Sequence, residues 1–132
     1  MNWNDYMLRV ERNSYHERDD WGVTSHSFDC YDADLEGLKE GDKLEPTSYH
    51  GEKMRRRKDP QTYLNCLKIE EKQLTFRFFY LEDYRGEEIT VGPDAPASTH
   101  GSTDRSSANY TVSLIPKAAY QPLEGYIKYE DQ

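Results

Sequence analysis

A chain of 132 residues is long enough to bury one core, and its net charge of −8 argues against general nucleic-acid binding, which needs a basic footprint. Its aromatic share of 13% is too high for a disordered chain. No apolar run approaches the roughly 18 residues of a membrane helix, and Met1–Asp5 lacks the basic and apolar regions of a signal peptide. We therefore expect one domain over residues 1–132, in the cytoplasm, with Cys30 and Cys66 reduced and buried.

The first two elements are predicted to be strands. Apolar residues at Tyr6, Leu8 and Val10 alternate with polar ones, and Phe28 and Cys30 continue an even-numbered face. Turn-forming residues separate the two runs at 19–22. A loop centred near Trp21 places position 14 opposite 28 and position 10 opposite 32, and it also places His16 opposite His26.

Residues 33–42 have a different pattern. Leu35 and Leu38 lie three positions apart, and Gly41 is a stop signal. One short helical turn fits, with Asp32 or Asp34 as its N-cap, and it must pack on a sheet because it is too short to be stable alone. A short strand around Leu44 follows and ends near Pro46.

The clearest element is a hairpin over 63–81. A turn centred between Glu71 and Lys72 pairs Ile69 with Leu74, Leu67 with Phe76, and Tyr63 with Tyr80. Such aromatic and branched cross-strand pairs stabilise a sheet well. Apolar residues on the opposite face, at 79 and 81, predict that this hairpin lies in the middle of its sheet.

The rest of the chain predicts short strands and one long loop. A turn at 83–86 precedes a strand at 88–91, and residues 92–107 are small and polar, with two prolines and nothing to bury, which predicts a long loop. Tyr110, Val112 and Leu114 alternate in a strand that Pro116 stops, and 125–129 forms the last strand. About seven short strands with at most one or two helical turns predict a mainly β fold, a single antiparallel sandwich or a partly open barrel.

Catalytic and metal-binding motifs are absent from the sequence. His16, His26 and Cys30 do not have the spacing of a zinc site, and the acidic group at 29, 32, 34 and 36 lacks the calcium-loop pattern. Serines near His100 have no third group to orient them, so they do not make a triad. We expect no catalytic residue, metal or cofactor, and a protein that is not an enzyme.

The strongest anomaly is a basic run inside a predicted loop at 51–60. Five positive charges fall within Lys53–Lys58 of this acidic chain. They could bind phosphate, nucleic acid or an acidic protein surface, or they could pair with the chain's own acidic surplus, which is the more common case. The candidate partner-binding residues are Lys53, Arg55, Arg56, Arg57, Lys58, Tyr49 and Trp21.

The chain has 11 tyrosines and two tryptophans, residue types that protein interfaces favour. The function we expect is a non-catalytic macromolecular binding protein, such as a small acidic inhibitor, immunity-type or assembly protein that docks on a protein partner. The alternative is a small-ligand protein or enzyme that holds a nucleotide or another phosphate-bearing metabolite in a β-barrel mouth. Nucleic-acid binding through residues 49–63 is a third hypothesis, which the overall charge disfavours.

Overall fold

The computed structural model of the chain describes residues 2–18, 23–46, 53–60, 63–79, 85–102, 106–122 and 128–131. Within these ranges the fold is mainly β, with ten strands in two five-stranded antiparallel sheets and only two 3₁₀ turns, η1 (Trp3–Asp5) and η2 (Lys117–Ala119). The predicted fold class is confirmed, although about seven strands was too few. Neither of these turns has the length and apolar character of a membrane-crossing helix.

The first sheet contains the chain's longest strands. Its order is β10-β2-β1-β9-β8, with the bounds β1 (Tyr6–Arg18), β2 (Val23–Asp34), β8 (Ala97–Ser102), β9 (Ser106–Pro116) and β10 (Lys128–Asp131). The second sheet has the order β4-β3-β5-β6-β7, with the bounds β3 (Lys43–Glu45), β4 (Arg55–Arg56), β5 (Tyr63–Ile69), β6 (Leu74–Phe79) and β7 (Arg85–Val91). The hairpin β5–β6 lies in the interior of this sheet, as its sequence predicts.

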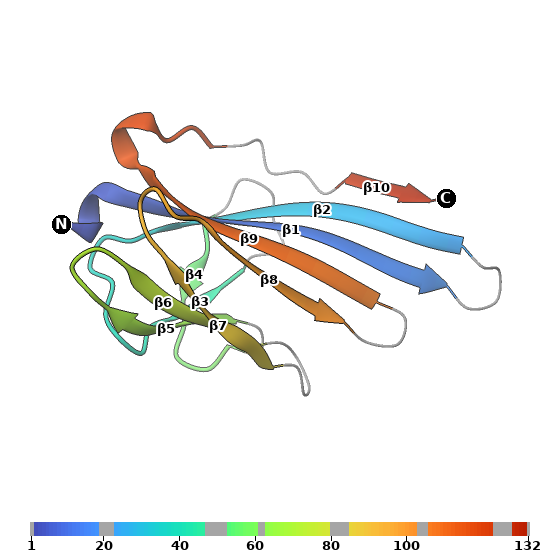
Figure 1. Cartoon of the computed structure of the whole chain (residues 1–132), viewed down its shortest axis with the longest axis horizontal. Helices are drawn as coiled ribbons and strands as arrows, with labels where there is room; N and C mark the ends of the chain where they lie inside the picture. Colours follow the sequence, from blue (N-terminus) through green and yellow to red (C-terminus); the bar gives the residue numbers. More distant parts are fainter. Residues whose placement is uncertain are drawn as a thin grey trace.

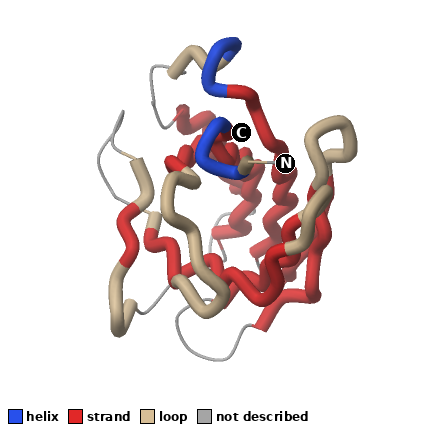
Figure 2. Tube along the Cα trace, turned by 90° about the vertical axis from the view of Figure 1, so that its left-hand side faces the viewer, coloured by secondary structure: helices blue, strands red, loops and turns tan. Residues whose placement is uncertain are grey.

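One core lies between the two sheets, which form two layers (Figures 1 and 2). The first sheet contributes alternate residues of β1 and β9, and the second contributes β5, β6 and β7. The largest fully buried side chains of this core are Leu8, Leu35, Leu44, Leu64, Leu74 and Phe76. In β3 and β5, Leu44 and Leu64 each lie between half-buried residues, which is the period-2 pattern of a strand with one face on the core.

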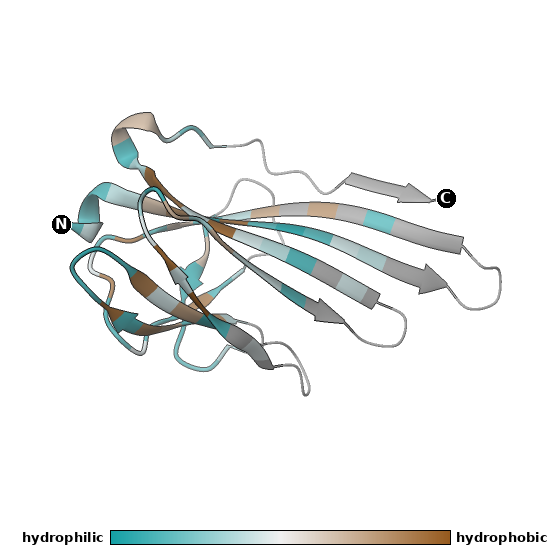
Figure 3. Cartoon of the chain, viewed as in Figure 1, coloured by the Kyte–Doolittle hydropathy of each residue, from teal (hydrophilic) through white to brown (hydrophobic). Residues whose placement is uncertain are grey.

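The first sheet extends beyond the second. In Figure 1 the described parts of β1, β2, β8 and β9 run on past the described strands of the second sheet. The apolar residues of β1 end at Val10, and polar residues follow from Glu11 to Ser14 (Figure 3). The core therefore occupies only one end of the long sheet.

The register of β1 and β2 differs by one residue from the prediction. Val10 lies opposite Tyr31 and Leu8 opposite Ala33, so the odd-numbered residues of β2 face the core. A one-residue shift moves every side chain to the other face, and Cys30 consequently lies half-buried on the outer face instead of in the core. The same shift of one residue separates the two histidines. His16 lies opposite Ser25, and His26 lies opposite Tyr15.

A β-bulge changes the register within the β5–β6 hairpin. Ile69 lies opposite Leu74 as predicted, but the pairing shifts between Cys66 and Lys68, so that Cys66 and not Leu67 lies opposite Phe76. Leu67 is the extra residue of the bulge. Before it, the even-numbered residues of β5 therefore take the face that the prediction gave to the odd-numbered ones. Tyr63 consequently lies opposite Phe79.

Residues 35–42 form turns and not the predicted helical turn. The carboxylate of Asp34 accepts a hydrogen bond from the backbone N–H of Glu36, and that of Asp42 accepts one from Lys39. Gly37 has a φ of 70°, in the left-handed region that the interior of a helix excludes, whereas the φ of 95° at Gly41 suits the stop that the sequence predicts there. Local side-chain bonds to the backbone compete with helix formation here.

Residues 92–107, predicted as a loop, contain a strand. Gly92 and Ala95 exchange backbone hydrogen bonds in a turn that carries the chain from one sheet to the other, and β8 then pairs with β9 from Ala97 to Ser102. The loop prediction was wrong because an edge strand needs few apolar residues. Ala97, which packs against the core, begins this one. The basic segment likewise contains β4, and β7 begins at Arg85, inside the predicted turn at 83–86. The last predicted strand, 125–129, is described only from Lys128, where β10 continues to Asp131; residues 125–127 lie outside the described ranges.

Candidate functional site

The basic run divides into residues with different roles. The Arg56 guanidinium donates hydrogen bonds to the backbone carbonyls of Asp34 and Glu36, at 3.0 and 2.6 Å. Arg57 forms an ion pair with Glu45 at 3.1 Å. These two arginines thus bind the chain's own acidic or carbonyl groups and hold β4 to its neighbours.

Met54 lies in the middle of the run and is buried. Its backbone N–H donates to the carbonyl of Asp32 at 2.7 Å, and its side chain belongs to the core. The residues on either side of it, Lys53 and Arg55, are exposed. An apolar anchor therefore holds two exposed cations at the edge of the core. Tyr49 and Trp21, the other two candidate residues, lie outside the described ranges.

Met54 also lines a small pocket between the sheets. The pocket has a volume of about 60 Å³ and mainly apolar walls. Its lining residues are Val10, Arg12, Tyr31, Pro46, Met54, Tyr63, Leu64, Phe78 and Tyr110. It lies where the core ends along β1, between buried Val10 and half-buried Arg12.

Aromatic rings and one cation form much of this lining. The Phe78 and Tyr110 rings lie 4.6 Å apart between centroids, at a tilt of 36°. The Arg12 guanidinium lies 5.7 Å from the centre of the Tyr31 ring, which is a cation–π distance. Arg12 is opposite Tyr110 in the β1–β9 register and opposite Asp29 in the β1–β2 register. We call these nine residues, together with the exposed Lys53 and Arg55, the pocket face.

Arg12 was not among the candidate residues from the sequence. The signal that could have found it is its position: it continues the even-numbered core face of β1 directly after Leu8 and Val10. A charged residue at the next inward position marks where a core ends. Only the fold could show that Met54 of the basic run lies at the same place.

A polar cluster lies on the outer face of the first sheet. The Asp32 carboxylate binds Arg9 through two 2.9 Å contacts and accepts a 2.7 Å hydrogen bond from the Tyr120 hydroxyl. Arg9 also donates to the carbonyl of Gln121. Burial, together with the bond to Asp32, raises the pKa of Tyr120 to about 12. The cluster joins the segment after β9 to the sheet and has a structural role.

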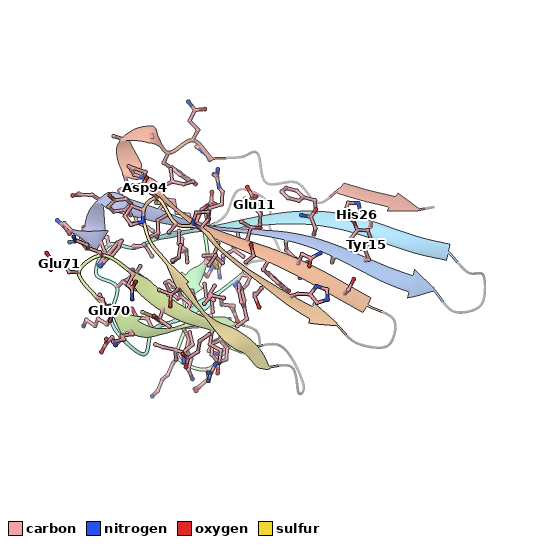
Figure 4. All side chains as sticks on the ribbon, in the orientation of Figure 1. Glu11, Tyr15, His26, Glu70, Glu71 and Asp94 are labelled. Carbon is pink, nitrogen blue, oxygen red and sulfur yellow. The ribbon has the colours of Figure 1, made fainter. Side chains whose placement is uncertain are left out.

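The cysteines and histidines form no reactive group among the described residues. Burial raises the pKa of both thiols to about 12, so Cys30 and Cys66 carry little thiolate near neutral pH. His26 stacks on Tyr15, with ring centroids 4.5 Å apart (Figure 4). His100 forms a hydrogen bond with Asn109. Nowhere in the described ranges do three His, Cys, Asp or Glu side chains gather as metal ligands would.

No protein-family model, curated protein or solved structure gives a significant match to this chain.

Proposed function

We propose that this chain is a non-catalytic protein that docks on a protein partner, and that the pocket face is its docking surface. One observation carries the proposal: a small pocket is lined by three tyrosines, by Arg12 and by Met54, whose neighbours in the chain, Lys53 and Arg55, are exposed cations. Tyrosine and arginine around an apolar pocket are the composition that interface hot spots favour.

The size of the pocket favours a protein partner over a metabolite. Ligand sites usually have volumes of roughly 300–1,000 Å³. The pocket holds about 60 Å³, which suits a single side chain. The nucleotide-binding alternative gains no support from it.

The described chemistry also favours binding over catalysis. A nucleophilic cysteine needs a low pKa, and both thiols have raised pKa values. Free thiols at Cys30 and Cys66 also agree with the reducing compartment that we propose for this protein.

A steric block of the pocket face tests the proposal. Lys53→Cys introduces a thiol next to Met54 in the chain, and Lys68→Cys introduces one in β5. Both Lys53 and Lys68 are exposed. A bulky maleimide should label only the new thiol at neutral pH, because both native thiols have a pKa of about 12. Each labelled protein, its unlabelled form and the wild type then serve as baits in lysate of the native host.

The expected result is a host protein that binds the wild type in a fixed ratio. It should also bind both unlabelled variants and the protein labelled at position 68, but not the protein labelled at position 53. The complex is then rebuilt from the two purified proteins, and its dissociation constant is measured for each form. A partner that binds equally well after labelling at position 53 contradicts the proposed surface, and the absence of any partner contradicts the proposed function.

A further inference from the structure

The chemistry of the pocket face identifies the kind of partner segment that fits it. Arg12 contributes a guanidinium to the wall, and Met54, another lining residue, is preceded and followed in the chain by the exposed cations Lys53 and Arg55. The pocket thus has one cation in its wall and two in the chain segment that carries Met54, in a protein whose net charge is −8. Complementary charge gives specificity to an interface.

Nearby carboxylates already have partners. Asp32, adjacent to Tyr31 in β2, binds Arg9 on the outer face, and Glu45, adjacent to Pro46, binds Arg57. Asp29 has the register position opposite Arg12. Arg12 has a contact within the chain, but a guanidinium has five N–H donors, so such a contact does not exhaust its capacity to bind a carboxylate of a partner.

The volume restricts the side chain that can enter. A cavity of roughly 150 Å³ accommodates benzene. A pocket of about 60 Å³ is too small for an aromatic ring and has room for the end of an aliphatic side chain.

We propose that the pocket takes an aliphatic side chain from an acidic segment of the partner protein, and that carboxylates beside this anchor bind Arg12, Lys53 and Arg55. This inference rests on the proposed function, because it names the partner chemistry of the same surface.

Titration with capped synthetic peptides tests it directly. The probe carries one leucine between glutamates. Three matched peptides replace the leucine by alanine, the leucine by tryptophan, or the glutamates by glutamine. Binding is followed at millimolar peptide concentration through the side-chain methyl signals of methionine, because Met54 lines the pocket and Met7 is buried outside the central core cluster.

The leucine–glutamate peptide should shift the Met54 methyl signal and leave that of Met7 unchanged. Each of the three replacements should weaken binding about tenfold, through loss of the anchor, of its fit or of its charge partners. Arg12→Gln should remove most of the preference for glutamate over glutamine, whereas Arg57→Gln, which changes an arginine outside the pocket lining, should preserve it. The thermal unfolding of each variant shows whether it is folded.

Two results overturn the inference. Glutamate and glutamine peptides that bind equally well contradict the charge complementarity, and a Met54 signal that none of the peptides moves contradicts the anchor. After either result, the pull-down with the protein labelled at position 53 separates the two proposals. If that label still prevents partner binding, the proposed docking surface is retained and only the proposed chemistry of the partner segment is wrong. If no partner depends on that face, both proposals fail.

Discussion

Arg9 and Asp32 form a two-pronged ion pair in which Nε and Nη2 of the arginine each lie 2.9 Å from a separate carboxylate oxygen. Both side chains are only 11% exposed. The Tyr120 hydroxyl and the Gln121 carbonyl complete the group, so the pair connects β1, β2 and the segment after β9.

Removal of Arg9 should destabilise the fold strongly. Arg9→Met keeps much of the aliphatic stem but leaves the Asp32 carboxylate half-buried without its cation. We expect the free energy of unfolding to fall by about 3 kcal/mol, because breaking a buried pair leaves an uncompensated charge. Urea unfolding measures it.

The matched control is Arg57→Met, because Arg57 also pairs with a carboxylate but its side chain is 57% exposed. An exposed pair of this kind contributes about 0.5 kcal/mol or less. Equal losses in the two variants would show that burial of the Arg9–Asp32 pair has no special weight.

The bulge in β5 predicts different costs for two leucines. Leu64 is buried opposite Phe78, whereas Leu67 lies at the register shift and is half-buried. Leu64→Ala should cost roughly 2–5 kcal/mol, as buried leucines do. Leu67→Ala should cost about 1 kcal/mol. Urea unfolding that gave the larger loss at Leu67 would restore the uninterrupted register that the sequence predicts.

Arg56 is expected to be the structural arginine of the basic run. Its Nη2 donates to two backbone carbonyls while its Nε lies 3.8 Å from the Asp42 carboxylate, a fork of two nitrogens that lysine, with a single nitrogen, cannot reproduce. Arg56→Lys should lower the free energy of unfolding by about 1–2 kcal/mol. Lys58→Arg, at an exposed position of the same run, should change it by less than about 0.5 kcal/mol in the same denaturation experiment. Equal changes in the free energy of unfolding for the two variants would contradict a special structural role for Arg56 within the basic run.

The protein should lose stability in alkaline solution. Burial raises the pKa of the Cys66 thiol from about 9.0 to about 12. Above pH 9 the unfolded chain loses this proton while the folded chain retains it, so the free energy of unfolding falls as pH rises through this window. The slope is roughly 1.4 kcal/mol per pH unit for such a thiol. Cys30 and Tyr120, whose pKa values are also raised to about 12, act in the same direction.

Cys66→Ala isolates this contribution. Its slope of stability against pH, measured by urea unfolding in the presence of a reductant, should be flatter than that of the wild type above about pH 9. Cys66→Ala can also change the free energy of unfolding at neutral pH by a constant amount. Such a constant difference does not change the slopes that are compared. Parallel slopes would mean that the thiol does not titrate differently in the two states.

Local patterns predicted the strands well and their registers less well. The alternation in β9 and its end at Pro116 could be predicted because each depends on neighbouring residues alone. The β1–β2 register depends on the centre of the connecting loop, and a one-residue difference moved Cys30 to the outer face. The bulge at Leu67 had no sequence signal, since it contains neither glycine nor proline.

The candidate site was predicted only in part. The charge of the basic run directed attention to the correct segment, but charge alone did not separate Arg56, which binds carbonyls, from exposed Arg55. Arg12 and Met54 are 42 positions apart in the chain, and only the packing of the two sheets brings them to one pocket. Contacts of this kind arise from tertiary structure and leave no local pattern.

The pairing of β1 with β9 has a consequence for synthesis. Tyr6 lies opposite Pro116, so the central strand obtains its second neighbour only when most of the chain has left the ribosome. Pairings between such distant segments also slow folding, to milliseconds or longer in comparable all-β domains. Until then, the nascent chain holds a strand of thirteen residues with one open edge. The interval between translation of β1 and of β9 is therefore the period in which this protein most needs protection from aggregation.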